Sequence, residues 1–467
     1  MKKIIAITAM AAAAAAFTFA DEPVADVKVA EFSGNASVTW GVDLDTQKTG
    51  FKNDWGSKLK VNITNEGTKK TEGEGIWAEL EIKGKSLYAE SEKGAAQSLK
   101  DGTVSVEKAL LHFGDAYLGI KEGDTVVGEF NSPNAVNSSK LGVSNTYDDA
   151  DNNAANNPDG HTHGIVAGYG NSLFDIAVDF RSHPIAGNYY TNDYGVAGEA
   201  TLKFVPGLEI KAGADYQIRY NDAESNKLGV GASEKYTLAL GDKFKLVEGV
   251  GFNMGKVVTN SDNPLMNLTA GVVFAWGDEA DAHAGVPYLD GDYAKKVTPG
   301  VGVAAAINNL TNDANRTIVI QPSFYSGDII PNLKVGVFGQ IGISTVSGNE
   351  AVFGVAGGLK YDLKATDALT ISPYAGARFL KNEAWATTAK LFDDTFTNEN
   401  GDNGNKKDLQ GSGNKKMNVK VGADVSGLIN NTTFSVWWQS RNLLNEDTDK
   451  KTNGQVGTIN IQCKIAL

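Results

Sequence analysis

Cysteine, proline and long apolar runs are all scarce in this chain of 467 residues. Its one cysteine, Cys463, cannot form an intramolecular disulfide, so stability must come from strand pairing and packing. After residue 20, no apolar run approaches the roughly 20 residues that a membrane-spanning helix needs. The formal charge of −13 argues against a nucleic-acid binder, which carries a basic patch. These features disfavour a disulfide scaffold, a helical membrane protein and a partner made of DNA or RNA.

Catalytic and cofactor-binding motifs are also missing. The chain has no GxSxG, no GxxxxGK[ST] and no HExxH sequence. Cys463 lies on the apolar face of a predicted strand, where a thiolate nucleophile is poorly stabilised. We therefore expect no enzyme and no cofactor.

One polar segment raises the question of a metal site. His161 and His163 flank one residue in an Asp-rich stretch, and two imidazoles at this spacing can share zinc or copper. The alternative, a solvated loop without metal, is the more common meaning of so short a motif. The preceding run DDADNNAANNPDG lacks the Gly and Glu positions of an EF-hand. We therefore expect no metal.

The first 20 residues have the three parts of a secretory signal peptide. Lys2 and Lys3 give a positive start, residues 4–17 are apolar, and Thr18-Phe19-Ala20 forms a small-residue cleavage pattern. Acidic residues follow at once, which disfavours a retained anchor. We expect export of the mature chain.

Apolar and polar residues alternate in many segments, as on a β-strand with one apolar face. The pattern is clear in 36–44, 59–63, 76–82, 174–180, 208–220, 268–276, 333–343, 353–363, 369–379, 417–425 and 434–438. Pro373 interrupts its segment and predicts a bulge or a strand end there. About 20 such segments, with high glycine content and no helical pattern, predict an all-β fold: a transmembrane antiparallel β-barrel of about 16–20 strands with long polar extracellular loops.

The segments between strands differ in length. The long polar ones cover 131–162, 277–299 and 383–416, with shorter ones near 221–233 and 441–454. Barrels place short turns on the periplasmic side and long loops outside. Counting back from a periplasmic C-terminus puts the 427–431 and 364–368 turns on the periplasmic side, as their shortness suggests. The same count also puts the long segment 277–299 on the periplasmic side. Either a strand is missing from the count or this is an inner-side insertion.

Three stretches resemble the treponemal major outer sheath protein family, which includes the Tpr proteins: TWGVDLDTQKTGF (39–51), ALLHFGDAYLGI (109–120) and VTPGVGVAAAI (297–307). The resemblance implies a spirochaete outer-membrane protein with an N-terminal region, 21–230, and a C-terminal barrel region, 231–467. It also implies porin activity, oligomers that are often trimers, and adhesion to host matrix proteins. Because 208–220 alternates cleanly, we extend the barrel into the N-terminal region.

The two faces of the predicted strands give two sets of candidate residues. Charged residues on the wet face would line the pore and set its ion preference, unless they face solvent on a soluble sheet. This pore-lining set comprises Glu79, Glu81, Asp175, Asp179, Arg181, Glu209, Lys211, Asp215, Arg219 and Lys464. The terminal strand, expected to close the barrel, would face lipid through Ile459, Ile461, Cys463, Ile465 and Leu467.

The sequence therefore predicts an outer-membrane porin for small hydrophilic solutes, with weak ion selectivity because acids and bases mix on the wet face. Its expected partners are outer-membrane lipid and those solutes. A surface adhesin whose barrel is only a scaffold is the alternative, and the two functions are compatible. A periplasmic β protein outside the membrane is a third hypothesis.

Overall fold

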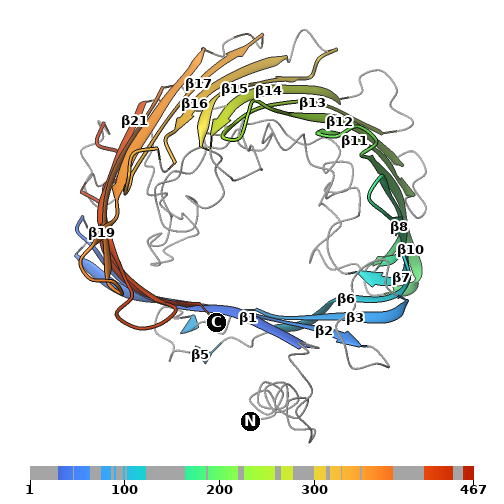
Figure 1. Ribbon diagram of the computed structural model, residues 1–467, viewed down its shortest axis with the longest axis horizontal. Coiled ribbons are helices and arrows are strands. Elements are labelled where there is room, and N and C mark those ends of the chain that lie inside the picture. Colours follow the sequence, from blue (N-terminus) through green and yellow to red (C-terminus); the bar gives the residue numbers. More distant parts are fainter. Residues whose placement is uncertain are drawn as a thin grey trace, which may run out of the picture.

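The computed structural model is an all-strand protein whose main sheet closes on itself (Figure 1). It describes residues 30–45, 47–63, 75–85, 89–90, 98–99, 103–121, 164–185, 188–218, 226–257, 265–276, 299–311, 316–327, 329–345, 347, 350–381, 415–444 and 456–466. Within these ranges no helix is long and apolar enough to cross a membrane. The signal-peptide prediction and the His161 and His163 alternatives lie outside the described residues.

The wall consists of 20 antiparallel strands, if β18 and β19, which are separated only by Asp362, are counted as one. The first half contains β1 (Ala30–Asp43), β2 (Lys48–Ile63), β3 (Ile76–Lys85), β6 (Thr103–Phe113), β7 (Ala116–Lys121), β8 (Gly164–Gly170), β9 (Phe174–Ile185), β10 (Asn188–Leu202), β11 (Leu208–Ile218) and β12 (Lys227–Ala239). The second contains β13 (Phe244–Val257), β14 (Leu265–Trp276), β15 (Gly300–Asn308), β16 (Thr317–Tyr325), β17 (Leu333–Ser344), β18 (Val352–Tyr361), β19 (Leu363–Lys364), β20 (Thr370–Lys381), β21 (Lys415–Ser426), β22 (Thr432–Gln439) and β23 (Thr458–Ala466). Two short strands, β4 (Ala89–Glu90) and β5 (Ser98–Leu99), pair outside the wall. The predicted fold class is confirmed.

The first and last strands close the barrel. β1 pairs with β2 on one side and with β23 on the other, in a register that runs from Asn35 opposite Ala466 to Asp43 opposite Thr458. The remaining wall strands pair with their sequence neighbours, so each connection spans one hairpin. β12 crosses position 230 without a break, and the wall is continuous through that point. The division into 21–230 and 231–467 stays a prediction about the family.

Short turns gather at the end of the barrel where β1 begins and β23 ends. They include Gly114-Asp115, 171–173, 203–207, 240–243 and 427–431. The segment 277–298, which is not among the described residues, joins β14 to β15 at this same end, and these strands are direct neighbours with Phe274 opposite Val301. No strand therefore lies in the wall between them, so a strand missing from the count is excluded for the described wall, and the inner-side insertion stays a prediction.

The prediction for Pro373 was wrong. Pro373 lies inside β20 and pairs in register with Ala423 on β21. Because proline has no N–H, the pairing on the other side of β20 is interrupted instead. That pairing stops at Lys360 opposite Tyr374 and resumes at Leu363 opposite Ile371, which divides β18 from β19. Pro322 of β16 has the same effect, because pairing with β17 is interrupted between Ile320 and Ser323 while the β15 side continues.

The loop expected near 221–233 was also wrong in its second half. β12 begins at Lys227 and pairs with both neighbours from its first residue. Its early inward positions are Gly229 and Gly231, which are buried. Glycine in place of polar side chains removes the contrast between faces, so a strand was read as a turn.

Candidate functional site

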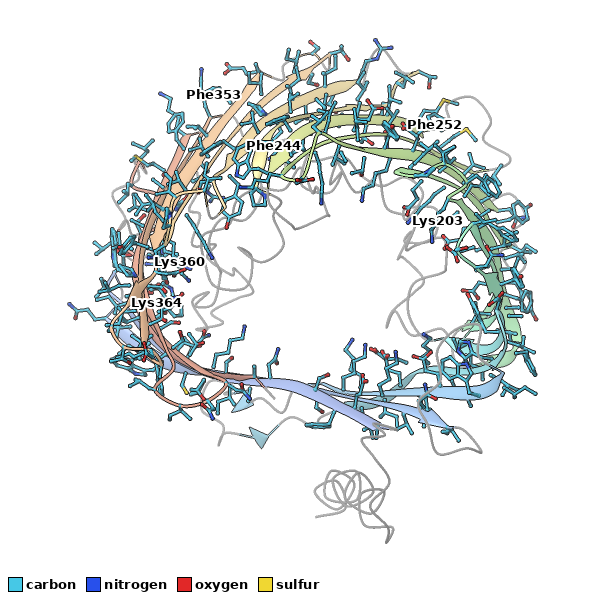
Figure 2. The ribbon with its side chains drawn as sticks, viewed as in Figure 1. Lys203, Phe244, Phe252, Phe353, Lys360 and Lys364 are labelled. Carbon is cyan, nitrogen blue, oxygen red and sulfur yellow. The ribbon has the colours of Figure 1, made fainter. Side chains whose placement is uncertain are left out.

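Two labelled side chains of one strand define the faces of the wall. Lys360 of β18 points into the barrel and Phe353 of the same strand points outward (Figure 2). Residues directly opposite each other on paired strands share a face, so the register carries this assignment around the barrel. The candidate functional site is the inner wall defined in this way.

The outer face is apolar around the whole wall. Exposed large apolar side chains on it come from strands along the full chain, among them Val38, Phe180, Phe274, Val301, Phe353 and Ile461. Continuous apolar surface of this extent is not stable against water and is what a lipid-facing band requires. On the closing strand, Ile459, Ile461 and Ile465 are exposed and Cys463 is half-buried, whereas Leu467 lies outside the described residues.

Two carboxylates interrupt this apolar surface. Glu234 of β12 lies opposite Val250, and Glu248 of β13 lies opposite Tyr236, so the two acids are diagonal neighbours on the outer face. Among the described strand positions of that face they are the only acidic residues. Ala232 and Tyr236 flank Glu234 on the same face of its strand, and Leu238 follows Tyr236, so the pair lies within the apolar band rather than at its edge.

On the inner wall, β2, β3 and β6 share a network of ion pairs. The Glu79 carboxylate lies 2.9 Å from Lys60 Nζ and 2.9 Å from Lys108 Nζ, and its side chain is 4% exposed. A register shift between Glu81 and Ile82 inserts one extra residue into β6 and brings Glu107 onto the same face.

The exposed fractions show which groups of this network face the lumen. The lysine side chains Lys58, Lys60 and Lys83 are 46%, 42% and 41% exposed. Their partners are more buried: Glu81 contacts Lys58, and Glu107 lies 2.6 Å from Lys83. The carboxylates therefore lie against the wall, while the ammonium groups reach toward the lumen.

An aromatic stack adjoins the network near the short-turn end. The Trp77 and His112 rings lie parallel with centroids 3.8 Å apart, and Tyr117 lies 5.8 Å from His112. Tyr117 covers Gly168 of β8, where an added Cβ would lie only 2.3 Å from its ring. His112 Nε2 lies 3.6 Å from Glu79, which joins the stack to the ion pairs.

The wall formed by β18 and β20–β22 combines cations with aromatic rings. Lys360 donates to Asp424 at 2.7 Å, and the Lys420 ammonium lies 5.7 Å from the Tyr374 ring and 5.3 Å from the Trp437 ring. Gly422 makes this packing possible, because a Cβ there would lie 2.6 Å from the Tyr374 hydroxyl and 2.7 Å from Trp437 Cβ. Trp437 therefore lies on the inner face, and Trp438, which is in phase with exposed Val436, on the outer face.

A buried arginine joins the two sides of the barrel seam at the end opposite the short turns. Arg441 donates to both oxygens of Asp43, at 3.0 and 2.8 Å, and also to Asp45. Asp45 in turn accepts the backbone N–H groups of Val456 and Gly457. Burial lowers the pKa of the guanidinium, but the hydrogen bonds and charges of Asp43 and Asp45 outweigh this and raise the pKa above its ordinary value.

Comparison with known proteins gives full-length relatives. Major surface protein MspTL of Treponema lecithinolyticum is 28% identical, over 94% of this chain and 93% of that protein. Major outer membrane protein MspA of Treponema maltophilum is 27% identical, over 96% of this chain and 97% of that protein. The chain is a homologue of the treponemal major surface proteins. No family model matches it.

Solved structures that resemble this chain are bacterial outer-membrane proteins. OccK11 of Pseudomonas aeruginosa aligns over 94% of this chain and 97% of its own, with 7% identity and a TM-score of 0.46. OpdK of the same organism, crystallised with vanillate, aligns over 94% and 99%, with 12% identity and a TM-score of 0.43. At these TM-scores nothing about solutes follows for this chain.

The described members of the predicted pore-lining set are spread around the inner wall. Glu79 and Glu81 belong to the ion-pair network, Asp175 lies 2.5 Å from Lys203, and Glu209 lies 3.3 Å from Lys211. Of the other predicted residues, Asp179 is buried on β9 and Lys464 is half-buried on β23. The side chains of Arg181 and Asp215, and all of Arg219, lie outside the described residues.

Several inner-wall residues were missed by sequence reasoning. Lys58 and Lys60 stood in the alternating pattern but were not singled out, and Glu107 requires the β6 bulge to be known. Arg378 and Lys420 follow the same period of two on β20 and β21, so the alternation itself was the signal for them.

Proposed function

We propose that this protein is an outer-membrane porin through which small hydrophilic solutes diffuse passively. The observation that supports this most directly is the closed barrel of 20 antiparallel strands with an apolar outside and a charged inside. Barrels of 16–18 strands already enclose an aqueous channel, and one of this size has a wider interior. The names of the two relatives agree with a location in the outer membrane at the cell surface.

Planar-bilayer recording of the refolded full chain tests the proposal. The expected result is stepwise ohmic conductance, absent from the same protein denatured by heat before addition. Insertion without conductance, with the barrel shown to be folded by its heat-modifiable gel mobility, would contradict a porin and leave the barrel as a scaffold.

The lysines of the ion-pair network should tune ion selectivity. Replacing Lys58, Lys60 and Lys83 together with glutamine removes three ammonium groups from the lumen side and leaves Glu79, Glu81 and Glu107 behind. A unit charge about 10 Å away in water changes an ion's energy by about 0.4 kcal/mol, which is roughly a factor of two in its local concentration. Because cations gain and anions lose by this factor, we expect the cation-to-anion ratio to rise roughly fourfold per lysine before screening by salt.

Reversal potentials in a salt gradient measure this shift. Lys243→Gln is the matched control, because it removes one lysine from the exposed turn after β12. An unchanged cation-to-anion permeability ratio in the triple variant would show that these side chains do not line the conducting path.

Host-protein adhesion and trimer formation stay predictions. An adhesin would use the long segments 131–162 and 383–416. The first lies outside the described residues, as do residues 383–414 of the second and most of 441–454.

A further inference from the structure

Three turns at the short-turn end share one backbone design. In Val205–Leu208, Ile330–Leu333 and Ile429–Thr432, the N–H of the last residue donates to the carbonyl of the first, at 2.9, 3.1 and 3.2 Å. Their third residues all have positive φ: Gly207 at 80°, Asn332 at 64° and Asn431 at 58°. With proline second in two of them, this is the geometry of a type II turn.

The same residue also ties each turn to the next hairpin. The carbonyl of Gly207 accepts from Thr237, that of Asn332 from Asp362, and that of Asn431 from Ala466, at 2.7 to 2.8 Å. Each turn is thus closed by one hydrogen bond of its own and fixed to the next hairpin by a second.

Two large apolar side chains stand at the start of each of these fixed turns, one on the residue before the turn and one on its first residue. Phe204 and Val205 are 60% and 50% exposed, Ile329 and Ile330 are 57% and 45% exposed, and Leu428 and Ile429 are 61% and 58% exposed. Polar residues would satisfy the turn geometry equally well, so the backbone does not explain this composition. Exposed apolar pairs at three equivalent places point to a common apolar environment.

The position of the three pairs favours lipid as that environment. The turns join β10 to β11, β16 to β17 and β21 to β22, which lie on separate arcs of the wall (Figure 1). What they share is the level at one end of the barrel, which a membrane surface can contact all round. They also continue the apolar outer face, since Leu202, Phe324 and Val425 precede them on that face.

We propose that the apolar pairs Phe204–Val205, Ile329–Ile330 and Leu428–Ile429 insert into the lipid headgroup layer and anchor the short-turn end of the barrel at the membrane surface. Apolar side chains at such interfaces are buried about 5–10 Å into the boundary between headgroups and acyl chains. The inference rests on membrane insertion of the barrel and adds that its apolar band extends past the strand ends to the turns.

A fluorescent label on single cysteines tests the depth of these turns. The environment-sensitive dye NBD is attached at Cys463 in the natural chain, and at Leu428→Cys or Glu350→Cys in a Cys463→Ser background. Each protein is refolded into phosphatidylcholine vesicles containing a headgroup nitroxide lipid. Cys463 reports the outer face, and Glu350 is an exposed control in the β17–β18 connection at the opposite end.

The expected result is a blue-shifted emission at position 428, strong quenching by the nitroxide lipid and loss of quenching by aqueous iodide, with the reverse at position 350. Equal behaviour at 428 and 350, with Cys463 shielded, would overturn the anchoring while membrane insertion stood. If Cys463 were also open to iodide, insertion itself and hence the proposed function would fail.

Two further measurements keep the result unambiguous. Ile329→Cys in the same background repeats the test on another arc, should Leu428→Cys fail to show heat-modifiable mobility. Shielding that survives dilution to about one protein per vesicle supports lipid contact. Shielding lost on dilution would assign the turns to contact with a second copy and overturn the proposal.

Discussion

Arg441→Met is expected to lower the free energy of unfolding by about 3–5 kcal/mol, because it leaves two carboxylates buried without their cation. The Arg441 side chain is 6% exposed, and those of Asp43 and Asp45 are 13% and 6% exposed. Asp45 also holds the backbone of Val456 and Gly457, so the loss affects the junction where β22, β23 and β1 meet. Urea unfolding from lipid vesicles, followed by tryptophan fluorescence, measures the change.

Lys203→Met is the matched control for this arginine. It also breaks an ion pair within the barrel, but the side chains of Lys203 and Asp175 are 40% and 45% exposed, and such pairs contribute about 0–1 kcal/mol. In a triple variant with Asp43→Asn and Asp45→Asn added, much of the lost stability should return, since no buried charge is left unpaired. If Arg441→Met were no less stable than Lys203→Met, the seam would not depend on this arginine.

The period of two made the architecture predictable, and it failed where one face lost its contrast. Strands such as Leu208–Ile218 alternate apolar and charged residues, which was enough to predict a barrel of this size. β13 was not recognised, because Gly249 and Gly251 occupy its inward positions and Glu248 lies on its outward face. A glycine inside and an acid outside reverse the pattern on which the prediction depends.

The pairs of the inner wall could not be predicted from the same pattern. Alternation places Glu79 and Lys60 on the wet face, but their contact depends on the register of β2 and β3. Glu107 enters the network only through a bulge, and Arg441 meets Asp43 from almost the other end of the chain. Sequence gives the face of a side chain, whereas register and closure give its partner.

Ile461→Lys on the closing strand should lower the free energy of unfolding by about 2–4 kcal/mol, the usual effect of a lysine at the middle of a lipid-facing strand. Ile461 is 48% exposed on the outer face and lies between Trp40 of β1 and Val436 of β22. The fraction of refolded protein with heat-modifiable mobility, and its urea midpoint in vesicles, measure the loss.

The adjacent position supplies the control. Gln462 lies on the inner face, opposite Thr39 and Ser435, and donates to the Thr39 hydroxyl at 2.8 Å. Gln462→Lys loses that hydrogen bond, worth about 1 kcal/mol, but its ammonium reaches the lumen, so assembly should proceed. Because a slip of one residue exchanges the two faces of a strand, the order of the two variants tests the register of the seam. If Gln462→Lys were the more damaging, the closing strand would be paired with β1 in the wrong phase.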